Sequence, residues 1–259
     1  MDLLKRIAPD RSSFAFRHAK ELGFGLLAVA AVIVAVLALT ARPGGVGTSP
    51  VPVPSVLEKS RARVPNVDII GDAYVAGADK GGLGAANWTK IVGSRFYEQG
   101  LPVAINVIGH PGAGYTVRGP GKFTFAEAAN TSLRSTADLV LVFGGRNDGP
   151  QEAPNMTAAA KDLYARIRER APQAKLLVVG PAWTDAKVPD FVASNSQAIG
   201  DAASAAGADF ISPLKEGWFF GADSALIDAD GVHPTDAGHQ YLAEKMYNLI
   251  SKDLAAVSP

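Results

Sequence analysis

The segment IIGDAYVAG, from Ile69 to Gly77, decides how the rest of the chain is interpreted. Its first two residues end the apolar run VDII at 67–70, which leads into a Gly-Asp turn and then into Ala73. Short apolar runs that end at a glycine are typical of buried β-strands. We therefore predict a strand over residues 67–70, with Ala73 just beyond its carboxyl end.

The same pattern recurs along the chain. Further strands are expected at 103–108, 138–143, 175–180 and 209–211. Stretches with helical spacing of apolar residues lie between them or after them, at 86–99, 123–133, 155–170, 191–206 and roughly 235–254. This alternation predicts an α/β fold in which a parallel sheet of about five strands carries helices on both faces. Ligands in such folds bind at the carboxyl ends of the strands.

Composition limits the possible functions. The chain has 259 residues, of which 47% are hydrophobic, so it can form one sizeable domain with an appendage. Lysine plus arginine and aspartate plus glutamate both number 25, so the chain lacks the basic excess that nucleic-acid binding requires. It has no cysteine, which excludes disulfides and thiolate metal sites.

The N-terminal part of the sequence is predicted to be a membrane anchor. Residues 22–39 form an uncharged apolar run of 18 residues, close to the length that crosses ~30 Å of hydrocarbon. Five lysines and arginines precede it, which predicts a cytoplasmic N-terminus and an extracytoplasmic remainder. The expected organisation is a basic segment 1–21, a transmembrane signal-anchor 22–41, a Pro/Gly-rich linker 42–65 and a domain 66–259. A cleaved signal peptide and a buried core helix are the alternatives.

Polar residues follow several of the predicted strands, in the segments 109–116, 144–149 and 181–185, and precede the last helix at 228–239. In the last of these, Asp230 stands three residues before His233. That spacing allows the carboxylate to orient the imidazole as a base. The alternative is a simple helix entry, with Thr235 or Asp236 as the cap and His233 exposed to solvent.

These blocks, in this order, resemble the SGNH (GDSL-type) hydrolase family over roughly residues 67–254. The resemblance implies a flavodoxin-like three-layer sandwich and an esterase, deacetylase or acyltransferase of the Ser-His-Asp type, without a cofactor or metal. It implies that His233 is the general base and that Asp230 orients it. It further implies an oxyanion hole formed by the side chain of Asn147 and the backbone N–H groups of Ala73 and Gly112, with Gly114 as an alternative to Gly112.

The family's nucleophilic serine falls on Ala73, which has no hydroxyl group, so the chain as given should be nearly inert. Three explanations are open: a deliberate Ser→Ala variant, a natural relative that kept only binding, and an unrecognised nucleophile. Tyr74 and Thr116 are weak candidates for the last, because neither occupies the turn position that exposes a nucleophile.

Other residues carry weaker expectations. Four of them could contact substrate: Asp72, Gly114, Arg146 and Trp183. We expect the aromatic segment 218–220 to pack in the core or a lid rather than line a subsite, and His239 to be structural.

The expected substrate is an acylated carbohydrate or lipid ester of the cell envelope. The alternatives are a non-catalytic module that binds such an ester and a purely structural envelope protein. The sequence does not determine the acyl chain, the acceptor, the oligomeric state or the balance between hydrolysis and transfer.

Overall fold

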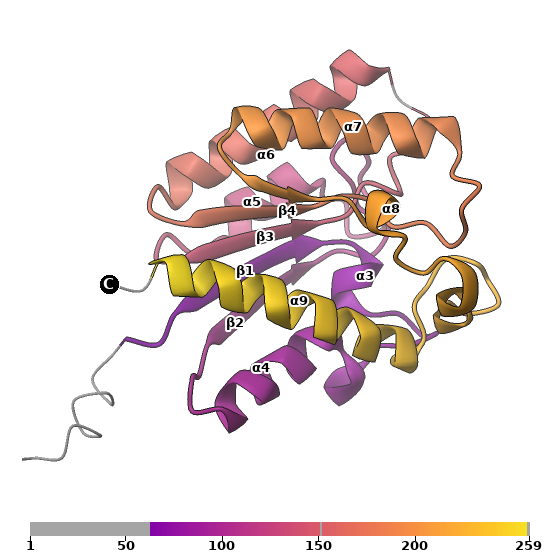
Figure 1. The fold of residues 1–259 in the computed structure, drawn as a ribbon. Helices are drawn as coiled ribbons and strands as arrows, with labels where there is room; N and C mark the ends of the chain where they lie inside the picture. Colours follow the sequence, from indigo (N-terminus) through magenta and orange to yellow (C-terminus); the bar gives the residue numbers. More distant parts are fainter. Residues whose placement is uncertain (1–62, 151, 258–259) are drawn as a thin grey trace, which may run out of the picture. The chain divides into compact units, whose positions relative to one another are not determined.

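The computed structural model describes residues 63–150 and 152–257 and contains the predicted parallel sheet (Figure 1). The chain divides into two units, Met1–Arg61 and Ala62–Pro259, and all described residues belong to the second. The predicted basic segment, the anchor and most of the linker lie outside the described residues. Within the described ranges, no helix is both long and apolar enough to cross a membrane.

The sheet has five parallel strands in the order β2-β1-β3-β4-β5. Their bounds are Asn66–Gly71 for β1, Ala104–Gly109 for β2, Leu139–Phe143 for β3, Lys175–Val179 for β4 and Asp209–Ile211 for β5. The five predicted strands are therefore confirmed, with ends that differ by at most one residue. Burial on both faces explains why each strand reads as a nearly continuous apolar run.

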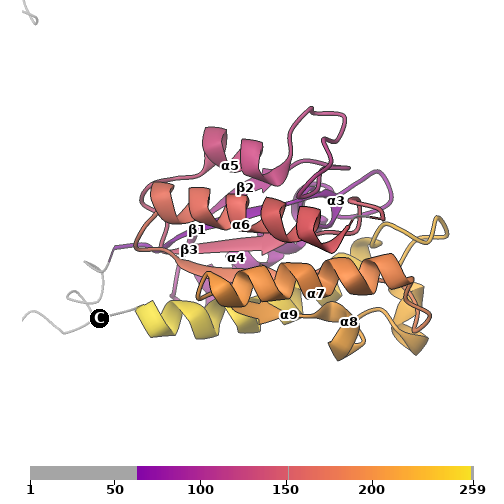
Figure 2. The ribbon, with the colours of Figure 1, turned by 90° about the horizontal axis from the view of Figure 1, so that it is seen from above.

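Helices cover both faces of the sheet (Figures 1 and 2). One face packs against α5 (Phe125–Ser132), α6 (Ala153–Arg170) and α7 (Asp190–Ala205), and the other against α4 (Trp88–Glu98) and α9 (Asp236–Val257). Alternate residues of each strand pack into the two helix layers, because successive side chains of a strand point to opposite faces of the sheet. Ile70 and Val142 belong to the first layer, and Ile69 and Leu141 to the second.

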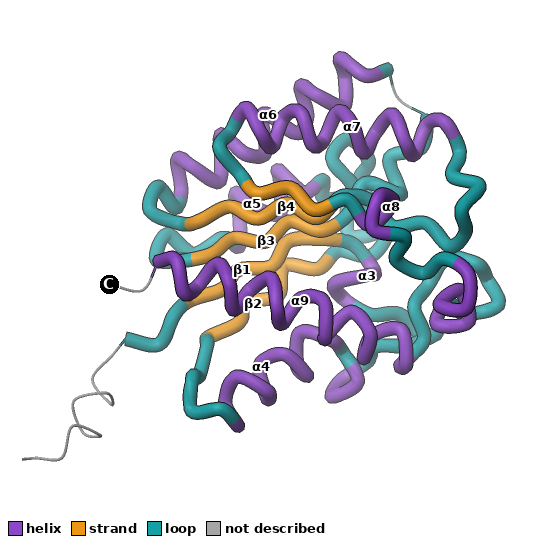
Figure 3. The backbone as a smooth tube through the Cα atoms, viewed as in Figure 1, coloured by secondary structure: helices purple, strands orange, loops and turns teal. Residues whose placement is uncertain are grey.

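Four short helical turns were not predicted. They are α3 (Ala73–Ala76), the 3₁₀ turns Gly84–Ala86 and Gly221–Leu226, and α8 (Pro213–Glu216). Each lies in a connection that Figure 3 colours mainly as loop. Elements this short show no apolar periodicity. Side-chain caps begin the two short α-helices: Asp72 accepts from Tyr74 N at the start of α3, and Ser212 accepts from Lys215 N at the start of α8.

A buried ionic cluster lies on β1, toward the end of the strand that is remote from the Gly-Asp turn. The Asp68 side chain is fully buried and accepts hydrogen bonds from Arg134 Nε at 2.6 Å, Arg134 N at 2.8 Å and Asn106 Nδ2 at 3.0 Å. The Arg134 guanidinium also donates to the carbonyl oxygens of Val67 and Ala104. The cluster thus connects β1, β2 and the segment that leads from α5 to β3.

Candidate active site

The predicted site residues follow the carboxyl ends of the strands, at the edge of the sheet where α3 and α8 lie in Figure 1. Side-chain hydrogen bonds connect segments far apart in the sequence: residue 147 with residue 72, and residues 74 and 146 with the 228–235 segment. The polar segments that follow the strands therefore come together at this edge of the sheet.

Ala73 is the first residue of α3, directly after the Gly-Asp turn. The turn requires a glycine at position 71, because a Cβ there would lie 2.4 Å from the Phe143 carbonyl oxygen and 2.4 Å from Val75 Cγ2. Ala73 is 7% exposed. A residue at the first position of a helix has no intrahelical acceptor for its N–H, so the backbone of Ala73 offers a donor at this point.

Asp230 and His233 form the predicted pair. His233 Nδ1 lies 2.7 Å from Asp230 Oδ2, and Asp230 Oδ1 accepts from the backbone N–H groups of Val232 (2.7 Å) and His233 (2.9 Å). These bonds, chiefly the one to the His233 ring, hold the pKa of Asp230 well below its usual range. A carboxylate on Nδ1 fixes the ring so that Nε2 is available as a base.

The alternative interpretation of this segment also holds in part. Helix α9 begins at Asp236, and Thr235 Oγ1 accepts from Gly238 N at 3.2 Å, as a helix cap does. The capping threonine and the carboxylate–imidazole pair therefore occupy adjacent parts of one loop, and the two interpretations are compatible.

Asn147 is held by two acceptors. Its Nδ2 donates to Asp72 Oδ2 and to the Ala113 carbonyl oxygen, both at 2.9 Å. An amide nitrogen has two hydrogens, so both donors of Asn147 are engaged. An oxyanion on Nδ2 would have to replace one of these acceptors, and the oxyanion role of Asn147 stays a prediction.

Asp72 lies beneath the site rather than on its surface. It is 2% exposed, and its two oxygens accept separately from Tyr74 N at 2.9 Å and from Asn147 Nδ2. Burial raises the pKa of Asp72 to about 6, although the hydrogen bond from Tyr74 N opposes the shift. This geometry gives Asp72 a role in positioning Asn147 in place of the predicted substrate contact.

Gly112 and Gly114 differ in what their N–H groups do. Gly114 N donates to the Val117 carbonyl at 2.9 Å, whereas Gly112 N has no acceptor within the described part of the chain. Gly114 is also packed against a carboxylate, since a Cβ there would lie 2.6 Å from both oxygens of Asp148. The available donor favours Gly112 over Gly114 in the predicted oxyanion hole and leaves Gly114 as a packing residue.

The sequence analysis gave no role to Asp148, which organises the turn after β2. It accepts from Tyr115 N at 3.2 Å, Thr116 N at 2.6 Å and Thr116 Oγ1 at 2.8 Å. In the sequence, only its position directly after Asn147 could have indicated that Asp148 has a role near the site. The Thr116 hydroxyl donates to Asp148 and the Tyr74 hydroxyl donates to the Val232 carbonyl. Neither residue occupies position 73, so a nucleophilic role for either stays a weak prediction.

Arg146 and Trp183 contact each other. The Arg146 guanidinium stacks over the Trp183 ring at 4.2 Å from its centroid, and Arg146 Nη2 donates to the Gly231 carbonyl at 2.8 Å. Both residues lie at the predicted edge, and their contact with substrate stays a prediction.

Three further expectations concern packing. Trp218 and Phe219 are at most 1% exposed in the layer between the sheet and α9, so core packing is confirmed for both. His239 is fully buried, and its ring lies against Gly82, as expected of a structural residue.

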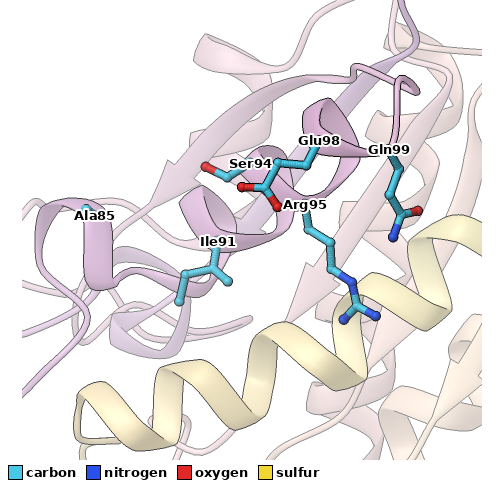
Figure 4. Close-up of a pocket in the computed structure, with 6 residues that line it drawn as sticks. All are labelled: Ala85, Ile91, Ser94, Arg95, Glu98 and Gln99. Atoms are coloured by element: carbon cyan, nitrogen blue, oxygen red, sulfur yellow. The ribbon is translucent and has the colours of Figure 1, made fainter.

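Two surface cavities lie on α4, outside the predicted site. One of about 460 Å³ is lined by Ala85, Ile91, Ser94, Arg95, Glu98 and Gln99 (Figure 4). The other, of about 470 Å³, lies toward β2 and includes Tyr97 and Ile105. None of the predicted site residues lines either cavity.

Comparison with known proteins identifies the family. Residues 69–241 match the GDSL-like lipase/acylhydrolase family. The chain is 38% identical over 195 residues to GDSL lipase Rv0518 of Mycobacterium tuberculosis, an alignment that covers 74% of this chain and 84% of the relative. The chain therefore belongs to the GDSL-like lipase/acylhydrolase family.

Solved structures agree in fold. The lipase/acylhydrolase from Enterococcus faecalis superposes with a TM-score of 0.59 at 17% identity, over 72% of this chain and 95% of that one. The psychrotrophic esterase EstA from Pseudoalteromonas superposes with a TM-score of 0.57 at 16% identity, over 73% of this chain and 98% of that one. At these identities the likeness concerns the fold, which is that of the SGNH hydrolases.

Proposed function

We propose that the described domain has the frame of an enzyme that cleaves or transfers acyl groups of esters, with Ala73 at the nucleophile position. The observation that carries the proposal is the Asp230–His233 pair, joined at 2.7 Å on the loop that leads into α9. In this proposal His233 is the general base and Asp230 orients it. The N–H groups of Ala73 and Gly112, with Asn147, stabilise the oxyanion.

A serine at position 73 would complete the reaction. Its hydroxyl oxygen would attack the ester carbonyl while His233 Nε2 takes the proton, and the carbonyl oxygen would become an oxyanion. Collapse of this intermediate would expel the alcohol, which receives the proton from His233, and would leave an acyl-enzyme. Water or a sugar hydroxyl, deprotonated by His233, would then remove the acyl group. Each well-placed oxyanion donor contributes roughly 3–4 kcal/mol to such a step.

The chain as given lacks the hydroxyl, so it forms no acyl-enzyme at this position. Attack by water activated directly by His233 would keep only the base and the oxyanion donors, and would be slow. We therefore expect turnover to be very weak.

A non-catalytic binding module is the second candidate. The observation that favours it is Ala73 itself, because this residue keeps the backbone donor and removes only the side-chain oxygen. Such a module would hold an acylated glycan or lipid without cleaving it.

The proposed location is the outer face of a membrane, which rests on the apolar run 22–39 and the basic residues before it. These residues lie outside the described part of the chain. The proposed substrate class, carbohydrate or lipid esters of the cell envelope, follows from that location and from the family.

Hydrolysis of p-nitrophenyl acetate by four forms of the full chain tests the proposal: the chain as given, His233→Ala, Ala73→Ser, and Ala73→Ser with His233→Ala. We expect kcat/KM to rise by at least about 10³-fold in Ala73→Ser and to fall back when His233 is also replaced.

Two results would contradict the enzyme proposal. Activity of the unmodified chain that survives His233→Ala would rule out this mechanism. An inactive Ala73→Ser variant that still binds an acylated ligand would favour the binding module.

A further inference from the structure

The loop that carries the acid-base pair is internally ordered. Asp228 N donates to the His233 carbonyl at 2.8 Å, and Gly231 N donates to the Asp228 carbonyl at 2.9 Å. The Asp230 carboxylate adds the bonds to Val232 N, His233 N and the His233 ring. These contacts fix His233 relative to Asp230, but they do not fix the loop relative to residue 73.

The base of the loop is attached separately. Thr235 N and Thr235 Oγ1 both donate to the Leu226 carbonyl, and Ile227 pairs with Pro234 across an isolated bridge. These bonds close the loop where it meets α9. The tip, at residues 230–233, needs other partners to hold one orientation.

Two long-range hydrogen bonds supply them. The Tyr74 hydroxyl donates to the Val232 carbonyl at 2.8 Å, and Arg146 Nη2 donates to the Gly231 carbonyl at 2.8 Å. The accepting carbonyls are consecutive. Tyr74 directly follows the nucleophile position, and Arg146 directly precedes Asn147, so the two donors come from the segments that bear the other predicted site residues.

Both donors are themselves held in place. Tyr74 is 4% exposed, and its ring makes edge contacts with Phe143 and Phe219. Burial raises the pKa of Tyr74, so its hydroxyl remains a donor at any ordinary pH, and the Arg146 charge lies close to it. Stacking on Trp183 holds the plane of the Arg146 guanidinium.

We infer that Tyr74 and Arg146 are positioning residues that latch the tip of the 230–233 loop, so that His233 faces residue 73. The catalytic part of this inference rests on the proposed function. In this role Arg146 acts through the loop and Trp183 acts through Arg146. The latch explains why two polar side chains of the site donate to consecutive backbone carbonyls of one loop.

Hydrogen exchange on the chain as given tests the latch without any catalysis. Tyr74→Phe and Arg146→Met, which remove the donor, should each speed exchange of the amides at 231–233 by about 3–10-fold, the effect of losing one hydrogen bond. Amides of the sheet should not change. Tyr97→Phe and Arg166→Met are matched controls, because both side chains are exposed and distant in sequence from the loop. Unchanged exchange at 231–233 in both latch variants would overturn the inference.

Kinetics in the Ala73→Ser background test the consequence. Tyr74→Phe and Arg146→Met should each lower kcat by about 10–100-fold, the scale expected for small displacements of a catalytic group, with KM changed less than twofold. Arg146→Lys keeps a charged donor group, so its kcat should lie between that of the donor-free Arg146 variant and that of the Ala73→Ser parent. A raised KM with an unchanged kcat would instead make Arg146 a substrate contact and overturn its positioning role.

The two experiments separate the possible failures. If Ala73→Ser shows no activity, the proposed function fails, while hydrogen exchange still decides whether the latch exists. If Ala73→Ser is active but neither latch variant lowers kcat, the positioning role fails and the proposed function stands.

Discussion

Replacing Asp72 by asparagine should change how the stability of the fold depends on pH. Burial raises the pKa of Asp72 from 3.8 to about 6, so the folded state holds this proton more tightly than the unfolded chain does. The resulting stabilisation is fully present below pH 3.8 and is lost as the pH rises through 6. At 1.36 kcal/mol per pKa unit the whole effect is about 3 kcal/mol, of which about 2 kcal/mol falls between pH 4 and 7.

Urea unfolding of the full chain and of Asp72→Asn, followed by tryptophan fluorescence at several pH values, measures this effect. The free energy of unfolding of the unmodified chain should fall by about 2 kcal/mol relative to the variant from pH 4 to pH 7. Loss of the acceptor for Asn147 adds an offset, but that offset does not depend on pH. A difference that stays constant over this range would refute the reasoning.

Glu127→Gln is a control of opposite sign. The hydrogen bond from Arg118 lowers the pKa of Glu127 to about 2, so its stabilisation is present above pH 4.5 and is lost as the pH falls through 2. Relative to Glu127→Gln, the unmodified chain should therefore gain stability as the pH rises from 3 to 5, the reverse of the trend for Asp72.

Two further substitutions test a buried ion pair at the sheet and the packing of the turn after β2. Arg134→Met leaves the fully buried Asp68 carboxylate without its cation and should lower the free energy of unfolding by about 3–5 kcal/mol, measured by urea denaturation; a loss below about 1 kcal/mol would show that the cluster contributes little. Gly114→Ala places a methyl group 2.6 Å from the oxygens of Asp148 and should destabilise the turn after β2. Its melting temperature should fall, whereas Gly93→Ala, whose Cβ would make an ordinary 3.5 Å contact, should leave it unchanged or slightly raised.

The sheet could be predicted from the sequence because its strands are buried on both faces. A run such as residues 139–143, in which every side chain is buried, has no plausible position outside a core. The four-residue helix α3 could not be predicted, because its single turn is held by the Asp72 cap and by packing, and leaves no periodic pattern.

Contacts of the site between residues close in sequence could be predicted, whereas contacts between residues far apart in sequence could not. The Asp230–His233 pair spans three residues, so its spacing allowed the contact, and the family resemblance favoured it over a simple helix entry. The bonds from Tyr74 to Val232 and from Arg146 to Gly231 join residues 158 and 85 positions apart, and no local pattern encodes them. The engagement of both Asn147 donors likewise depends on where Asp72 and Ala113 meet in the folded chain.

The self-contained loop of Asp230 and His233 affects how their presence beside Ala73 is interpreted. Because the hydrogen bonds that join Asp230 and His233 lie within their own loop, the pair does not depend on a hydroxyl group at position 73. The presence of Asp230 and His233 beside Ala73 is therefore no sign by itself that the chain turns over a substrate. The same independence means that a serine introduced at position 73 would meet an acid-base pair that is already formed.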